Sequence, residues 1–199
     1  MKGILFKPEM LQACIEGRKS VTRRLIKPQP VGGLRKSVFS SSGIEDAHGK
    51  TVKPRYLPGE IVYVKEGWCE DYYGQNIHYK LDGGESPGPK GFWRSPLMMP
   101  EKCARYWLRI KDVRAERLQE ITEDEARREG VVPGLYKGDG EFWFWQGGRT
   151  ETSHEQMIGW GANYRDGFRF VWKNINGPGS WEASPWVFRH EFEFLKVRP

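Results

Sequence analysis

The chain is poor in cysteine and in any arrangement of metal ligands. Its 199 residues include only three cysteines, Cys14, Cys69 and Cys103, and no CxxC pair. An odd count at wide spacing argues against a disulfide framework and predicts buried or free thiols in a reducing cytoplasm. The four histidines show neither HxxxH nor HExxH spacing, so the sequence gives little support for a metal site and signals no organic cofactor.

Long apolar runs are also missing. No stretch approaches the roughly 18 apolar residues of a membrane-spanning helix, and no apolar segment typical of a signal peptide follows the N-terminus. We therefore expect a cytoplasmic protein that has no membrane partner. The oligomeric state is not predicted.

Acidic residues are scarce in the first third of the chain. Residues 1–60 hold 12 Lys and Arg against five Asp and Glu, a net charge of +7, whereas the other 139 residues hold 20 against 21, a net charge of −1. Localised positive charge is typical of proteins whose partners carry phosphate. RNA or a modified nucleoside is the expected partner and DNA is a second option. Basic residues that serve only solubility are the alternative.

The pattern of apolar residues predicts a mainly β protein with peripheral short helices, of the α+β class. Strands are expected at 3–6, 61–66, 77–81, 104–118 (one long strand or a bent pair) and 186–197. Helices are expected near 8–15, 122–129 and 168–176, the second opened by a capping box of Thr122 and Glu125. The pattern suits a small β-barrel forming one domain over 1–199.

Long insertions interrupt these elements near 27–58, 69–100 and 133–165. The first is rich in Pro, Gly, Ser and Lys and is interpreted as a long loop. The third carries the aromatic run 142–145. Most of the 27 aromatic residues are expected in the core, but Trp68, Trp143 and Trp145 are candidates for stacking on bases.

The stretch 17–24 (GRKSVTRR) places an amine, two hydroxyls and three guanidinium groups within eight residues, directly after a predicted helix. If Lys19 to Thr22 form one β-turn, their Cα atoms lie within about 7 Å, so that one small substrate reaches both side chains. A cationic pocket with a hydroxyl at its edge suits an anion, a polar carbonyl or a nucleobase. A basic surface loop is the alternative interpretation.

Glu129 is the carboxylate that stands out. It lies in the last turn of a short predicted helix, where the negative end of the helix dipole disfavours an acidic group. A residue placed against its local preference sometimes has a role in a site. An exposed glutamate at a helix end is the alternative.

Four ordered blocks resemble the ASCH domain family of the PUA superfamily of β-barrels. Residues 15–23 (IEGRKSVTR) resemble its GRKxxTxR signature, 58–66 its PGD…VRE strand, and 121–130 its helix ending in Glu-Gly. The tail, from Trp172 to Val187, is similar to the longer ASCH-like proteins common in phages and prophages.

The resemblance implies a PUA/ASCH-like small β-barrel that handles RNA or modified nucleosides. A compact bacterial member is an amidohydrolase of N4-acetylcytidine, and its Lys, Thr and Glu fall here on Lys19, Thr22 and Glu129. Thr22 would attack or position a water, Lys19 would take the proton, and Glu129 would serve the leaving amine. No cofactor is needed for this scheme.

A non-catalytic module that captures RNA, DNA or a modified base is the main alternative. Arg18, Arg23, Arg24 and Trp68 would then bind nucleic acid, while Lys19 and Thr22 would only hydrogen-bond the base. A third interpretation is a phage accessory protein that binds another protein through an exposed patch at 142–145.

Overall fold

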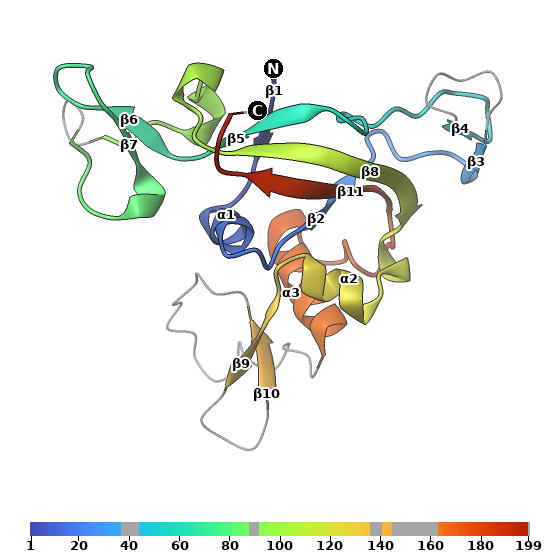
Figure 1. The fold of residues 1–199 in the computed structure, drawn as a ribbon. Coiled ribbons are helices and arrows are strands. Elements are labelled where there is room, and N and C mark those ends of the chain that lie inside the picture. The colour runs from blue at the N-terminus through green and yellow to red at the C-terminus, as the bar shows by residue number, and fades with distance from the viewer. Residues whose placement is uncertain (37–43, 88–91, 136–140, 145–162, 199) are drawn as a thin grey trace.

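A five-stranded mixed sheet forms the centre of the protein. The computed structural model describes residues 1–36, 44–87, 92–135, 141–144 and 163–198 (Figure 1). The sheet has the order β1-β5-β8-β11-β2. Its strands, in that order, are Lys2–Leu5, Ile61–Lys65, Trp107–Arg117, Trp186–Leu195 and Val21–Leu25. Only β1 and β5 pair in parallel; the other three pairs are antiparallel.

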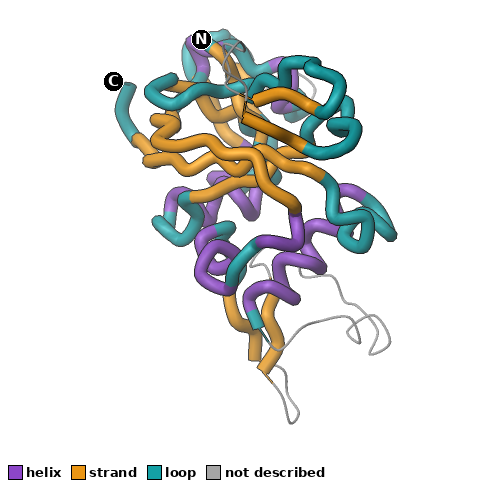
Figure 2. Tube along the Cα trace, turned by 90° about the vertical axis from the view of Figure 1, so that its right-hand side faces the viewer, coloured by secondary structure: helices purple, strands orange, loops and turns teal. Residues whose placement is uncertain are grey.

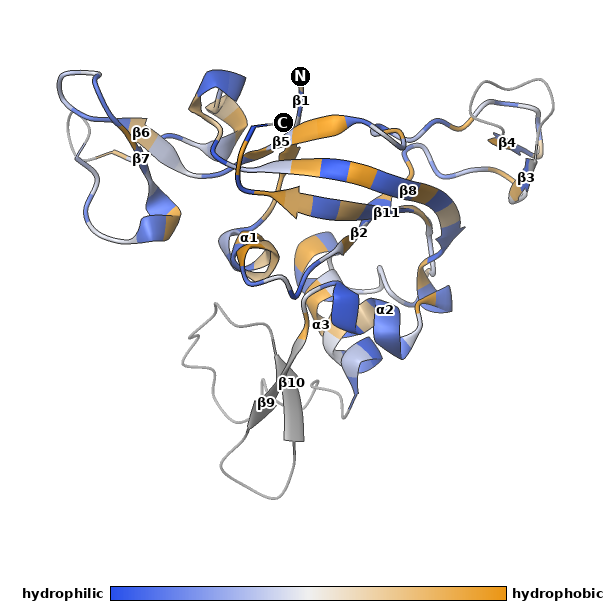
Figure 3. Ribbon diagram, viewed as in Figure 1, coloured by the Kyte–Doolittle hydropathy of each residue, from blue (hydrophilic) through white to orange (hydrophobic). Residues whose placement is uncertain are grey.

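The long strands follow the predicted alternation. Along β8, Leu108 and Ile110 are buried while Arg109 and Lys111 are exposed, as expected where successive side chains point to opposite faces. Figure 3 shows this as alternating bands on β8. The segment predicted as one strand or a bent pair is therefore a single strand.

Three helices lie together on one side of the sheet: α1 (Pro8–Ile15), α2 (Glu123–Arg128) and α3 (Tyr164–Asn176). Figure 2 shows them as a separate layer below the strands. Each begins or ends with the predicted chemistry, because Pro8 opens α1, the Thr122 hydroxyl caps α2, and Gly177 ends α3 at a φ of 92°. Apolar side chains of α1 fill the core under β1, β5 and β8. The mainly β architecture with few short helices is confirmed.

Three hairpins extend from this body: β3 (Leu34–Lys36) with β4 (Ile44–Asp46), β6 (Trp68–Glu70) with β7 (Ile77–Tyr79), and β9 (Val132–Leu135) with β10 (Glu141–Phe144). Short 3₁₀ turns lie at Lys80–Asp82, Pro96–Met98, Glu101–Cys103 and Leu118–Glu120. The interpretation of 27–58 as a long loop was thus wrong in part, because it contains β3 and β4. Strands of three residues are too short to show a period of two.

Hydrogen bonding does not close the sheet into the predicted barrel. Among the described residues β1 and β2 remain its two edges. The Arg24 side chain of β2 spans the gap, since its Nη2 donates to the Leu5 carbonyl of β1 at 2.6 Å. A side chain thus occupies a backbone acceptor that a neighbouring strand would otherwise use. Two cavities are lined by both residues of this contact.

Two further features concern the membrane and thiol predictions. No helix in the described part of the chain is long and apolar enough to cross a membrane. Cys14, Cys69 and Cys103 are all free and buried. Burial raises the pKa of the Cys14 thiol to about 12, which keeps it protonated at neutral pH.

Candidate functional site

The basic motif leads from α1 into β2 as extended chain. Gly17, at a φ of 76°, ends the helix as predicted. Lys19 then forms an isolated antiparallel bridge with Glu129, and Thr22 already belongs to β2. The β-turn suggested for Lys19 to Thr22 is therefore absent. The motif instead reaches the site by pairing with the end of α2.

Lys19 is held by three hydrogen bonds in the interior. Its residue is 1% exposed, and Nζ donates to Glu129 Oε2 at 2.6 Å, to the Glu129 carbonyl at 2.9 Å and to the Val21 carbonyl at 2.8 Å. An ammonium has three protons to donate, so every one of them has a partner. Lys19 therefore fixes the position of the Glu129 side chain.

Glu129 is buried and lies between two cations. Besides the Lys19 contact, its Oε1 accepts from Arg23 Nη1 at 3.1 Å. A carboxylate out of water needs such paired and hydrogen-bonded charges. Structure thus brings together two predicted site residues that are 110 positions apart. Glu129 is not the exposed helix-end glutamate of the alternative interpretation.

Arg23 joins this pair to a larger buried ion-pair network. Its Nε donates to Glu116 Oε1 at 2.7 Å and its Nη2 to Glu125 Oε2 at 2.6 Å. Glu125 also pairs with Arg114 and, at 3.0 Å, with Arg189. Of these side chains only Arg23 was predicted as a site residue, and its predicted role was contact with nucleic acid.

The capping box could have pointed to Glu125. Thr122 does accept from the Glu125 backbone N–H at 3.3 Å. The Glu125 carboxylate, however, turns away from the N-cap and binds Arg23, Arg114 and Arg189. A glutamate at this helix position can bond either to the nearby N-cap or to cations that are remote in sequence. The sequence shows only the N-cap.

Thr22 and Glu129 line a cavity of about 590 Å³ between β1, β2 and α3, which we call the apolar cavity. Much of its wall is hydrophobic, with Phe6, Met10, Phe168, Val171 and Trp172 among the lining residues. Thr22 is 3% exposed, and its hydroxyl has no hydrogen-bond partner among the residues described. Lys19 lies behind this wall, with Nζ 5.8 Å from the centre of the Phe6 ring.

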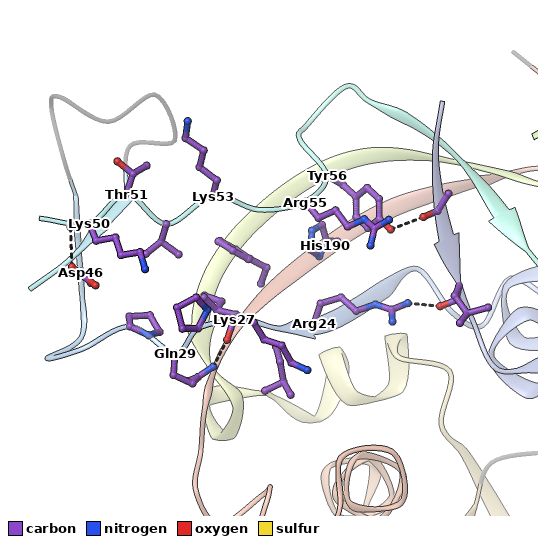
Figure 4. Close-up of a pocket in the computed structure, with 18 of the residues that line it drawn as sticks. Arg24, Lys27, Gln29, Asp46, Lys50, Thr51, Lys53, Arg55, Tyr56 and His190 are labelled. Carbon is purple, nitrogen blue, oxygen red and sulfur yellow. Dashed lines mark hydrogen bonds between the residues drawn. The ribbon is translucent and has the colours of Figure 1, made fainter. Parts of the chain in front are cut away.

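A second cavity of about 530 Å³ adjoins the first and shares Leu5, Arg24, Leu25 and Lys27 with it. Figure 4 shows the basic side chains that gather around it, from β2 to the segment after β4. We call it the cationic cavity. Arg24 thus lies at the junction of the two cavities.

Arg18 and Trp68 lie apart from both cavities. Arg18 donates to the Gly130 carbonyl at 2.7 Å and to Glu16 at 2.7 Å, beside a different hollow. Trp68 is 3% exposed in the core of a hairpin, with Arg94 over its ring at 4.8 Å. The Trp143 side chain, Trp145 and the proposed patch at 142–145 fall outside the described side chains.

Gly130 allows the close approach that joins Lys19 to Glu129. It has a φ of 93°, and a Cβ there would lie 2.9 Å from the Ala13 Cβ and 3.1 Å from the Lys19 Cβ. We expect Gly130→Ala to lower the free energy of unfolding by about 1–3 kcal/mol more than Gly59→Ala does. Gly59 is the matched control because its φ is 85° with nothing within 4 Å. Urea unfolding measures both; equal losses would show that the contact with Lys19 is not tight.

Fold and site together define a mainly β protein with two adjoining cavities at the gap between its sheet edges. No family model, no curated protein and no solved structure matches this chain. In the described ranges no group of three or more His, Cys, Asp or Glu is placed to hold a metal ion.

Proposed function

We propose that this protein is an ASCH-like, PUA-like amidohydrolase that removes the acyl group from N4-acylcytidine in the apolar cavity. One observation carries the proposal: Lys19 and Glu129 are in contact at 2.6 Å, and Glu129 and Thr22 line the same cavity. The three residue types implied by the family resemblance therefore meet at one place. Modified nucleosides, free or within RNA, are the substrate class.

The cavity suits an N4-acylated cytosine in size and chemistry. Ligand cavities of several hundred Å³ are typical for small molecules, and this one measures about 590 Å³. Phe168 and Trp172 supply aromatic surface for the base. The Glu129 carboxylate is an acceptor for the N–H on N4, the contact that carboxylates make with cytosine.

We propose different roles for the three side chains. Glu129 takes a proton from a water whose oxygen bonds to the acyl carbon, and it returns that proton to N4 as the C–N4 bond breaks. The Thr22 hydroxyl donates to the acyl oxygen as negative charge develops there. Lys19 holds Glu129 and supplies positive charge, because its three protons are already donated. The products are cytidine and a carboxylic acid.

Lys19, whose three protons are all donated within the protein, also favours a second candidate. This candidate is a module that binds a modified base without reacting with it. In the structure both Glu129 oxygens already accept hydrogen bonds from cations, which fixes the carboxylate in place. Under this candidate Glu129 and Thr22 recognise the base edge only.

Chromatography of N4-acetylcytidine and other N4-acylcytosines after incubation with the purified protein tests the proposal. We expect conversion to cytidine, and a decrease in kcat/KM of at least about 100-fold in both Glu129→Gln and Thr22→Val. Glu193→Gln is the control, because this carboxylate is half-exposed on β11 and lines neither cavity. It should leave the rate unchanged.

The two candidates separate in the same experiment. Absence of conversion by the folded wild-type protein would contradict hydrolysis of these substrates. Saturable binding of N4-acetylcytidine that Glu129→Gln weakens would then support the binding module. Circular dichroism of each variant shows that a lost activity does not come from a lost fold.

A further inference from the structure

The cationic cavity has an unusual excess of unpaired positive charge. Six basic side chains line it: Arg24, Lys27, Lys50, Lys53, Arg55 and Lys65. Within the part of the chain that the structure describes, none of the six forms an ion pair with a carboxylate. Arg23, the neighbour of Arg24, pairs with three carboxylates. The cavity therefore contrasts with the neutralised interior beside it.

Among the described residues, Asp46 is the single carboxylate that lines this cavity, and its hydrogen bonds are local. Its residue is 5% exposed, and Oδ1 accepts from the backbone N–H groups of His48 at 3.0 Å and Lys50 at 2.9 Å. Asp46 thus stabilises the chain after β4. Six positive side chains against one carboxylate give the lining a net charge of +5.

Two buried donors in the cavity wall are poorly satisfied among the described residues. His190 is 1% exposed, and neither ring nitrogen forms a hydrogen bond of good geometry, although backbone groups of Phe188 and Thr22 lie near the ring. Its ring packs edge-on against Tyr56 at 5.6 Å. The Arg24 Nε is also buried and unpartnered. Unsatisfied polar atoms are costly in a protein interior, and ligand oxygens that accept from them would remove that cost.

We propose that the cationic cavity binds the phosphate groups of the ligand whose base occupies the apolar cavity. This inference rests on the proposed function and narrows its substrate to a phosphorylated nucleoside, either a mononucleotide or a residue within RNA. The two cavities share Arg24 and Lys27, so a base in one cavity places its phosphate beside these cations. Guanidinium and ammonium groups are the usual hydrogen-bond donors to phosphate in proteins.

The arrangement of the site favours a phosphate over other anions. Its cations come from β2 and the residues that follow it, from the chain after β4 and from β5, so they belong to several segments rather than to one strand. Several donors around one cavity match a group with three or four acceptor oxygens. The neutral His190 adds one N–H donor and Arg24 adds two or more.

Isothermal titration calorimetry with cytidine, CMP, pyrophosphate and a short oligocytidine tests this site. For wild-type protein we expect CMP to bind about tenfold or more tightly than cytidine, and this preference to fall with added salt. The double variant Lys50→Ala/Lys53→Ala should lose most of the preference. Lys111→Ala is the matched control, because Lys111 is exposed on β8 away from both cavities.

The outcomes distinguish the ligand source and the two proposals. Oligocytidine binding far tighter than CMP assigns the site to an RNA strand, and equal affinities assign it to a mononucleotide. Equal affinities of wild-type protein for cytidine and CMP would overturn the inference, as would unchanged CMP binding in the double variant. Binding of pyrophosphate by a protein that neither binds nor hydrolyses N4-acylcytidine would leave the phosphate site intact and contradict the proposed function.

Discussion

Replacing Arg23 by methionine is expected to lower the free energy of unfolding by about 3–5 kcal/mol. The Arg23 side chain is 0% exposed and pairs with Glu116, Glu125 and Glu129. Without it, three largely buried carboxylates lose a shared cation. Methionine fills much of the space but provides no charge. The decrease in the free energy of unfolding therefore measures the cost of leaving the carboxylates without a cation, rather than the cost of a cavity.

Arg24→Met provides the matched control for this prediction. It is the same substitution one residue along the same strand, at a cation whose one hydrogen bond to protein is to the Leu5 carbonyl among the described residues. We expect it to cost about 1 kcal/mol. Urea unfolding at pH 7, followed by tryptophan fluorescence, measures both variants. Equal losses would contradict the assigned role of the network, and a partial recovery in Arg23→Met/Glu116→Gln would support it.

Elements with enough residues to show a period were predictable from sequence. The alternation in β8 and β11 and the capping residue of α2 identified those elements nearly to their ends. For α3 the glycine after Asn176 identified the end of the helix, but its start at Tyr164 was missed. The hairpin of β3 and β4 was missed because three-residue strands have no visible period. Closure of a barrel was not predictable either, because it depends on whether β1 and β2 pair or, as here, a side chain occupies the gap.

The site was predictable only in part, because its contacts are remote in sequence. Local spacing suggested a β-turn that joins Lys19 to Thr22, and the chain is extended there instead. The Lys19–Glu129 pair spans 110 positions. No local pattern contains such a pair, and only the resemblance to a family related the two residues before the structure did.

Charge composition located the right region but not the right residues. Five of the six cations in the cationic cavity lie within residues 1–60, where the excess of Lys and Arg predicted a phosphate-bearing partner. Arg18 and Arg23 lie in the same region, yet their charges are paired with Glu16 and with the buried network. Only folding decides which cations keep their charge available for a ligand.

Acid is expected to destabilise the protein through His190. Burial, and next the positive charge of Arg24, lower the pKa of His190 from 6.5 to about 4 in the folded state. Between these values the unfolded chain binds a proton that the folded protein does not. The contribution of His190 to the free energy of unfolding is therefore fully present above pH 6.5. It is lost as the pH is lowered toward 4, and the loss from this residue alone is about 3 kcal/mol.

A comparison of wild-type protein with His190→Met isolates this effect. Urea unfolding at pH 7 and pH 4.5 gives the loss for each, and the loss should be about 2–3 kcal/mol larger for the wild type. The other titratable groups facing His190 are Arg24, Tyr56 and Glu129, and all three are kept in the variant. Parallel losses in the two proteins would show that His190 is not the responsible group.

Pyrophosphate should reduce the loss of stability that His190 causes in acid, if it binds in the cationic cavity. An anion beside His190 offsets the positive charge of Arg24 and favours the protonated imidazole, so the pKa of His190 rises toward its ordinary value. The difference between wild type and His190→Met at pH 4.5 should then shrink in saturating pyrophosphate. A difference that pyrophosphate leaves unchanged would place any bound phosphate away from His190.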